Sequence, residues 1–239
     1  MNGYITIIKN TIKNIRLNLY IIISIITYLA ISLSSIDNNF LIESPTRILG
    51  GFQLNQFPFS IYTLVWMIPK LMISYLLFIY IGNLLNINLF FSIIRIKSKI
   101  KWYILYNFIG LIVIIAWYVI GYITLNLVIC IKLGAIYDGF SQNINMLVLD
   151  ITFTYFIFNL VYLLGIVKKK VNLGIVLALI LYVSPIFTNN PDKMIFKILP
   201  SNHAMILRHE YLSNSYFYIF ILIIILLIIG CYLFKKTEF

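Results

Sequence analysis

The sequence carries very little charge for its length. Only 10% of its 239 residues are charged, whereas a soluble globular domain has about 25%. So few charged side chains cannot cover a globule in water, which excludes a soluble globular domain. In their place, 62% of the residues are hydrophobic, and the mean hydropathy is +1.00. This composition indicates a polytopic membrane protein with room for about six spans of ~20 residues.

Acidic residues are much scarcer than basic ones, with seven Asp and Glu against 18 Lys and Arg and a net charge of +11. A positive charge of this size could indicate nucleic-acid binding. However, the cations lie in short clusters that flank apolar runs, which is how membrane topology is encoded. We therefore interpret the charge as a topology signal and expect no nucleic-acid partner.

Motifs of known chemistry are also missing. The sequence has no G-x-x-x-x-G-K-[ST] nucleotide loop, no H-E-x-x-H zinc motif and no G-x-S-x-G nucleophile. His203 and His209 could ligate a metal with Glu210, but two ordinary interfacial histidines are the simpler interpretation. Cys130 and Cys231 are expected near opposite membrane faces, so we expect no disulfide between them. We expect no catalytic site and no cofactor or metal bound by the chain itself.

Six apolar runs predict an all-α fold, a single transmembrane domain covering residues 1–239. The expected spans are at about 17–35, 60–85, 103–131, 146–167, 171–187 and 216–234. Residues 2–16 place isoleucines and cations on different faces, which predicts an amphipathic cytoplasmic helix rather than a signal peptide. Residues 189–215 hold too many apolar side chains for a solvated loop and predict short re-entrant helices at the outer face.

The third run is longer than a bilayer requires. Trp102–Ile131 carries no charge and would be about 45 Å long as one helix. We expect this helix to tilt, break or protrude, with Gly110 and Gly121 as candidate weak points.

Most cations lie on one side of these spans, the side of the N-terminus, and almost all acids lie on the other. The positive-inside rule therefore predicts a multi-pass membrane protein with both termini in the cytoplasm.

Two ionisable residues fall within or near the spans, Lys70 and Asp150. Lys70 follows Pro69, which should kink its helix. It could extend outward to the interface, or it could face a polar pathway or pair with Asp150. Several deep tyrosines could line a cavity for an apolar or amphipathic ligand, or they could simply pack in the bilayer. These are Tyr118, Tyr122, Tyr155 and Tyr162.

The basic segment 90–102 lies between the second and third spans and carries four cations and no acid. It predicts a short interfacial helix on the cytoplasmic face, with aliphatic side chains on one side and cations toward water. The aliphatic and basic residues of this predicted helix are Ile94, Arg95, Ile96, Lys97, Lys99, Ile100 and Lys101.

The string Ile94-Arg95-Ile96-Lys97-Ser98-Lys99-Ile100-Lys101-Trp102 and the six-span layout resemble small permease subunits of type-two ABC exporters. The string is similar to the basic stretch of small permeases from low-GC Gram-positive bacteria that handle bacteriocins and amphipathic peptide toxins, so the resemblance implies a bacterial plasma membrane. The resemblance implies that the basic segment is a coupling helix docked on a separate ATPase subunit, which holds the ATP and Mg. It also implies a permease dimer, formed with a second copy or a sister subunit.

Two hypotheses of function follow. The first is the membrane subunit of an ATP-driven exporter of hydrophobic or amphipathic peptides. The alternative is a passive immunity or sensor protein that binds a peptide toxin in the membrane without ATP. An intramembrane enzyme would need a polar catalytic cluster, which the sequence does not contain.

Overall fold

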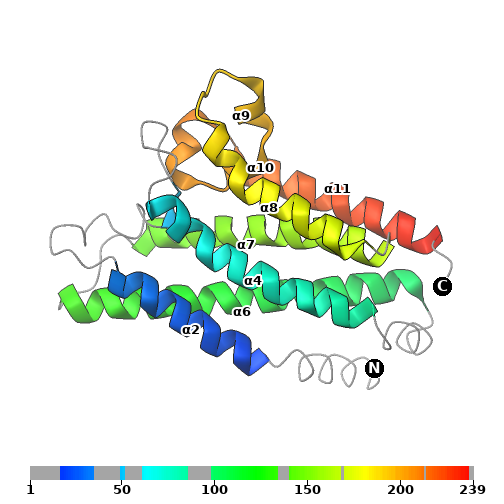
Figure 1. Ribbon diagram of the computed structural model, residues 1–239, viewed down its shortest axis with the longest axis horizontal. Helices are drawn as coiled ribbons and strands as arrows, with labels where there is room; N and C mark the ends of the chain where they lie inside the picture. The colour runs from blue at the N-terminus through cyan, green and yellow to red at the C-terminus, as the bar shows by residue number, and fades with distance from the viewer. Residues whose placement is uncertain are drawn as a thin grey trace.

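The computed structural model describes most of the chain as a bundle of helices. The described residues are 17–34, 49–51, 61–85, 98–133, 140–167, 170–212 and 214–236. Within them all regular structure is helical, and the long helices lie side by side along the long axis of the bundle (Figure 1). The amphipathic helix predicted at residues 2–16 and residues 90–97 of the basic segment lie outside the described residues.

The long helices of the described chain are α2 (Leu17–Ser34), α4 (Ile61–Leu85), α6 (Lys99–Leu133), α7 (Phe140–Tyr162), α8 (Val171–Phe187) and α11 (Ser215–Lys236). A turn of π-helix, η1 (Leu163–Val167), extends α7. Between α8 and α11 lie three short helices, α9 (Met194–Ile198), α10 (Pro200–His203) and η2 (Ile206–Tyr211). These three stand at one end of the bundle, beside the end of α8 and the start of α11 (Figure 1).

Four helices of the described chain are long and apolar enough to cross a membrane. The qualifying segments are Val65–Gly82, Lys99–Ile131, Asn143–Val167 and Ser215–Lys236. Two more apolar helices are shorter, Leu19–Ile31 and Val171–Phe187. The predicted all-helical fold with helices of transmembrane length is thereby confirmed, while the count of six spans and the re-entrant character of residues 189–215 stay predictions.

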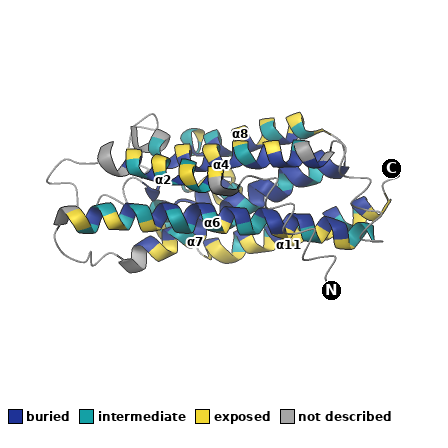
Figure 2. Ribbon diagram, turned by 90° about the horizontal axis from the view of Figure 1, so that it is seen from below, coloured by how far each residue is buried: buried dark blue, intermediate teal, exposed yellow. Residues whose placement is uncertain are grey.

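The distribution of side chains suits a lipid surrounding. Exposed positions lie along the outer sides of the helices (Figure 2). Many of them are held by isoleucine and other large apolar residues. Several polar side chains of the long apolar helices lie inside instead, and Lys70, Asn107, Asp150 and Asn159 are all buried. In lipid, polar groups must find partners inside the protein, whereas aliphatic groups can face outward. Burial and composition therefore both indicate a membrane protein.

The long third run forms one helix without a break. α6 has 35 residues and is about 52 Å long, more than the hydrocarbon thickness. Gly110 and Gly121 do not interrupt it. A Cβ atom at Gly110 would lie 2.3 Å from the ring of Phe158, and one at Gly121 would lie 2.2 Å from the ring of Tyr28. These glycines let aromatic rings of α7 and α2 approach the α6 backbone. Of the three alternatives, tilt, break or protrusion, a break at these glycines does not occur.

The bundle is arranged around α6, which packs against α2, α4, α7 and α11. Ser24 Oγ donates a hydrogen bond of 2.7 Å to the carbonyl of Trp117, and Tyr28 packs on Tyr122 with ring centroids 5.8 Å apart. The later residue of α2, Tyr28, contacts the later residue of α6, Tyr122, so the two helices run in the same direction. This is the relation expected for the first and third spans of an alternating topology.

The start of α6 meets the end of α11. The ring of Trp102 stacks on Phe234 with centroids 5.5 Å apart, and Tyr103 lies 5.3 Å from the same ring. Gly230 makes room for this contact, since a Cβ there would lie 2.1 Å from the Tyr103 hydroxyl. α6 and α11 are therefore antiparallel, and Lys99 and Lys236 belong to the same end of the bundle.

Candidate functional site

A buried ion pair joins α4 to α7. Lys70 Nζ lies 2.7 Å from Asp150 Oδ1, and the two side chains are 0% and 2% exposed. Both residues lie in segments long enough to cross a membrane, and α4 continues as a helix through Pro69. An isolated charge at this depth is expensive, so each residue makes the burial of the other tolerable.

Each charge has further partners. Tyr122 of α6 donates its hydroxyl proton to Asp150 Oδ2 at 3.0 Å. Lys70 donates a second hydrogen bond of 3.2 Å to the carbonyl of Trp66, and its ammonium lies 4.3 Å from the centroid of the Trp66 ring. An aromatic face stabilises a desolvated cation. Three helices, α4, α6 and α7, thus meet at this ion pair.

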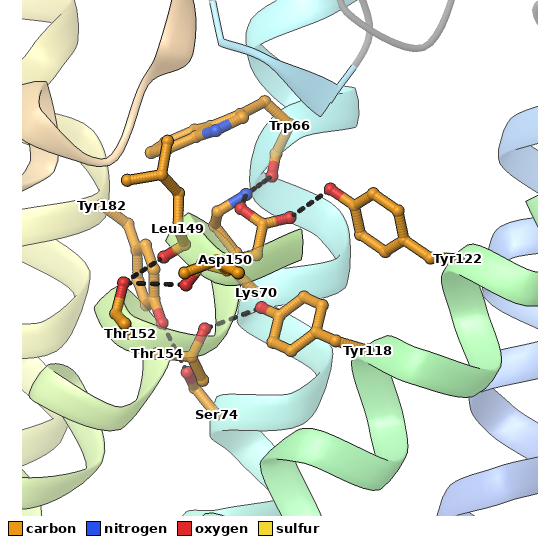
Figure 3. A network of polar contacts seen from close by, with 11 residues as sticks. Trp66, Lys70, Ser74, Tyr118, Tyr122, Leu149, Asp150, Thr152, Thr154 and Tyr182 are labelled. Atoms are coloured by element: carbon orange, nitrogen blue, oxygen red, sulfur yellow. Dashed lines mark hydrogen bonds and ion pairs between the residues drawn. The ribbon is translucent and has the colours of Figure 1, made fainter. Parts of the chain in front are cut away.

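A second polar layer lies beside the pair (Figure 3). The Tyr118 and Thr154 hydroxyls are 2.7 Å apart and join α6 to α7, and the Ser74 and Tyr182 hydroxyls are 2.6 Å apart and join α4 to α8. All four side chains are buried. One turn separates Tyr118 from Tyr122 and Thr154 from Asp150, so the two layers repeat at the helical period. We call the ion pair and this layer together the polar core.

A separate polar cluster lies nearer the start of α6. Asn107 Nδ2 donates to Asn159 Oδ1 at 2.7 Å, and Asn159 Nδ2 donates to the carbonyl of Tyr155 at 2.8 Å. The Tyr155 hydroxyl donates to Asn107 Oδ1 and closes the cluster. α6 and α7 are therefore held together by polar side chains at two levels of the bundle.

The predicted site residues fall into different places. Lys70 and Asp150 form the ion pair, so the alternative of Lys70 extending outward to the interface does not describe this geometry. Tyr118 and Tyr122 belong to the polar core, and Tyr155 lines a hollow on the side of the bundle. The fourth, Tyr162, is buried, and its hydroxyl donates to the carbonyl of Tyr103 at 3.2 Å.

The basic segment is described only at its end. Lys99, Ile100 and Lys101 form the first turn of α6, in which Lys101 is exposed. Ile94, Arg95, Ile96 and Lys97 lie outside the described residues. The last part of the predicted coupling helix is thus continuous with the central helix of the bundle.

The segment after α8 is held by a buried arginine. Arg208 is fully buried and donates to the carbonyls of Pro185 and Thr188 at 3.1 and 3.0 Å. It also donates to the side-chain oxygens of Asn189 and Asn202. A guanidinium at a helix C-terminus satisfies carbonyls that lack a partner within the helix. Burial lowers the pKa of Arg208 to about 10, so it stays charged at neutral pH.

The two histidines also serve this segment. His203 Nε2 is 2.8 Å from the carbonyl of Lys197, and His209 Nε2 is 3.0 Å from the carbonyl of His203. Because a carbonyl can only accept, both Nε2 atoms carry a proton, and His203 Nδ1 faces the Ser215 hydroxyl at 3.1 Å. Within the described residues, no three metal-ligating side chains form a group. The imidazoles therefore act as hydrogen-bond donors that fix the short helices.

Four buried polar residues of these clusters were not predicted from the sequence. Ser74, Thr154 and Asn107 are single polar residues in apolar runs, and Arg208 looks like an ordinary solvated cation. A signal existed for the first three, since a polar residue inside a membrane span tends to face the bundle interior. Nothing comparable marked Arg208, because its burial depends on where the end of α8 lies.

Chemically, the polar core can hold or release two opposite charges. The pair is neutral overall, and its members come from separate helices. Any movement of α4 away from α7 would leave two charges unpaired in an apolar surrounding unless water or a polar ligand entered. The pair therefore favours the closed arrangement of these helices and would resist their separation.

Comparison with known proteins identified no relative of this chain. No protein-family model matches the chain, and no curated protein and no solved structure matches it either.

Proposed function

We propose that the chain is the membrane subunit of an ABC-type exporter that moves hydrophobic or amphipathic peptides across a bacterial plasma membrane. In this proposal all six long helices cross the membrane, both termini are cytoplasmic, and residues 189–215 cap the outer end. A partner ATPase supplies ATP and Mg, and a second permease completes the pathway.

The observation that carries the proposal is the continuity of the basic segment with α6. Lys99, Ile100 and Lys101 are the first turn of a 35-residue helix that packs against four other long helices. A force applied at this turn would act on the centre of the bundle. A short amphipathic segment fixed to such a helix is a suitable lever for a nucleotide-driven partner.

The polar core is a second observation that supports the proposal. α6 contacts the ion pair through Tyr122, so movement of α6 would change the environment of both charges. In the proposed mechanism the pair is closed in one state of the bundle, as seen here, and open in the other. Such an ionic link between helices suits a transporter better than a passive anchor.

The test is a substitution in the first turn of α6. Ile100→Asp places a carboxylate in the predicted ATPase-binding surface and should abolish peptide-stimulated transport while leaving membrane insertion intact. Lys170→Asp, at an exposed position just before α8, is the matched control and should transport normally. Normal transport by Ile100→Asp would refute the lever.

Co-purification provides the second measurement. The chain should purify with an ATPase subunit, and Ile100→Asp should weaken that association. Protection against a peptide toxin that persists without any ATPase would contradict the exporter proposal and favour the passive immunity alternative.

A further inference from the structure

A hollow opens on the side of the bundle between α6, α7 and α11. Its volume is about 410 Å³, and its walls include Ile104 and Phe108 of α6 and Leu227, Ile228 and Cys231 of α11. It is open to the surroundings, since Ile104, Phe108 and Ile228 are 51%, 53% and 63% exposed. We call it the side groove.

The side groove lies within the membrane-crossing length of two helices. Its α6 wall belongs to Lys99–Ile131 and its α11 wall to Ser215–Lys236, both long and apolar enough to span. Its lining is almost wholly aliphatic and aromatic, apart from Asn107 and Tyr155, which are hydrogen-bonded to each other. A concave apolar surface at this depth is filled by hydrocarbon chains rather than by water.

One end of the groove has a basic rim. Lys101, Lys235 and Lys236 are exposed at the end of the bundle where α6 begins and α11 ends. Lys101 precedes Ile104 by one helical turn, and Lys235 follows Cys231 by one turn. Lys236 donates to the Tyr232 hydroxyl at 2.5 Å and lies over its ring.

No described acid offsets this rim. Asp192 and Glu210 belong to the segment at the opposite end of the bundle, and Asp150 is buried in the polar core. Clustered lysines at the cytoplasmic end of membrane helices attract anionic lipid headgroups. The same cations would repel a cationic amphipathic peptide.

We propose that the side groove binds an anionic phospholipid, with its phosphate at Lys101, Lys235 and Lys236 and an acyl chain between α6 and α11. The distance along α6 from Lys101 to Phe108 is about 10 Å, enough for the upper half of an acyl chain. The lipid would brace the contact of Trp102 with Phe234, where the basic segment enters the bundle. This inference rests on the membrane character of the chain and not on the exporter proposal.

Native mass spectrometry of the full chain tests it. The protein is extracted from vesicles of equal parts phosphatidylglycerol and phosphatidylcholine, and the retained lipid is identified. Wild type should retain phosphatidylglycerol in preference to phosphatidylcholine. Ile228→Trp fills the groove from an exposed position and should abolish retention, whereas Ile224→Trp, exposed on the same helix outside the lining, should not.

The headgroup contact is tested separately. Each of Lys101→Ala, Lys235→Ala and Lys236→Ala should weaken phosphatidylglycerol retention about fivefold. Lys170→Ala, an exposed lysine away from the groove, is the control and should change nothing. Size-exclusion profiles matching wild type establish that the variants are folded.

Three outcomes would overturn the proposal. They are equal retention of both lipids by wild type, unchanged retention by Ile228→Trp, and displacement of phosphatidylglycerol by a cationic amphipathic peptide that binds the groove more tightly. Absence of peptide transport by the wild-type protein together with its partner ATPase, with lipid retention intact, would contradict the exporter proposal alone, so the two proposals fail separately.

Discussion

At the residue scale, the Lys70–Asp150 pair has the largest energetic consequences. The lysine and the carboxylate are both buried and lie 2.7 Å apart. Removing one member leaves the other charged in a site that offers it few remaining partners. Removing one partner of a buried pair costs about 3–5 kcal/mol, whereas replacing both with apolar groups is often neutral.

This asymmetry gives a double-mutant prediction. Lys70→Met and Asp150→Leu should each lower the thermal unfolding temperature of the purified protein strongly, and the double variant should recover most of the loss. The measurement is unfolding in detergent followed by tryptophan fluorescence. If the unfolding temperature of the double variant falls by the sum of the two single decreases, Lys70 and Asp150 do not stabilise the fold as a pair.

Tyr122 provides a control for the Lys70 and Asp150 variants in the same unfolding measurement. Tyr122→Phe removes only the hydroxyl that donates to Asp150, so its effect should be smaller, about 1.5–3 kcal/mol for a hydrogen bond to a charged group.

At the scale of elements, the end of α8 and the short helices after it form a unit fixed by Arg208, His203 and His209. Burial lowers the pKa of both histidines below the usual value of 6.5. The unfolded segment therefore takes up protons at a pH where the folded segment does not. Stability contributed by the neutral histidines is present above about pH 6.5 and falls as the pH drops below it.

We predict that α10 and η2 loosen on acidification. Hydrogen–deuterium exchange of residues 200–211, corrected for the intrinsic rate, should be faster at pH 5.5 than at pH 7.5. His203→Gln, whose amide can still donate to the Lys197 carbonyl, should reduce the difference. Equal protection of residues 200–211 at both pH values in wild type would show that protonation of the histidines does not loosen α10 and η2.

The bounds of the helices were largely predictable from the sequence, whereas the packing partners of their side chains were not. The expected run 171–187 coincides with α8, and 17–35 and 60–85 differ from α2 and α4 by one residue at one end. Long apolar stretches bounded by charged or polar residues determine such limits. α6 begins earlier than the expected 103 because Lys99 and Lys101 continue its helix instead of ending it at the interface.

Side-chain partnerships depend on the rotation of each helix, which composition does not reveal. Lys70 and Asp150 could be paired from sequence because opposite charges in apolar runs have few other partners. Tyr118 with Thr154 and Ser74 with Tyr182 could not, since many hydroxyls were available for each.

For the whole molecule, the direction of insertion is the feature on which both proposals depend. α2 and α6 run parallel, α6 and α11 run antiparallel, and the exposed Lys101, Lys235 and Lys236 gather at one end. Asp192, also exposed, belongs to the segment at the other end. From the positive-inside rule we predict that the lysine-rich end faces the cytoplasm and that Asp192 faces the outside.

Cysteine labelling should reveal this orientation. In a variant lacking Cys130 and Cys231, Asp192→Cys should react with a membrane-impermeant maleimide in intact cells. Lys101→Cys and Lys170→Cys should react only after permeabilisation, because the bilayer shields them from the reagent. Labelling of Lys101→Cys in intact cells would place the start of α6 outside. That result would remove access of a cytoplasmic ATPase to the basic segment and would place the basic rim of the side groove in the outer leaflet.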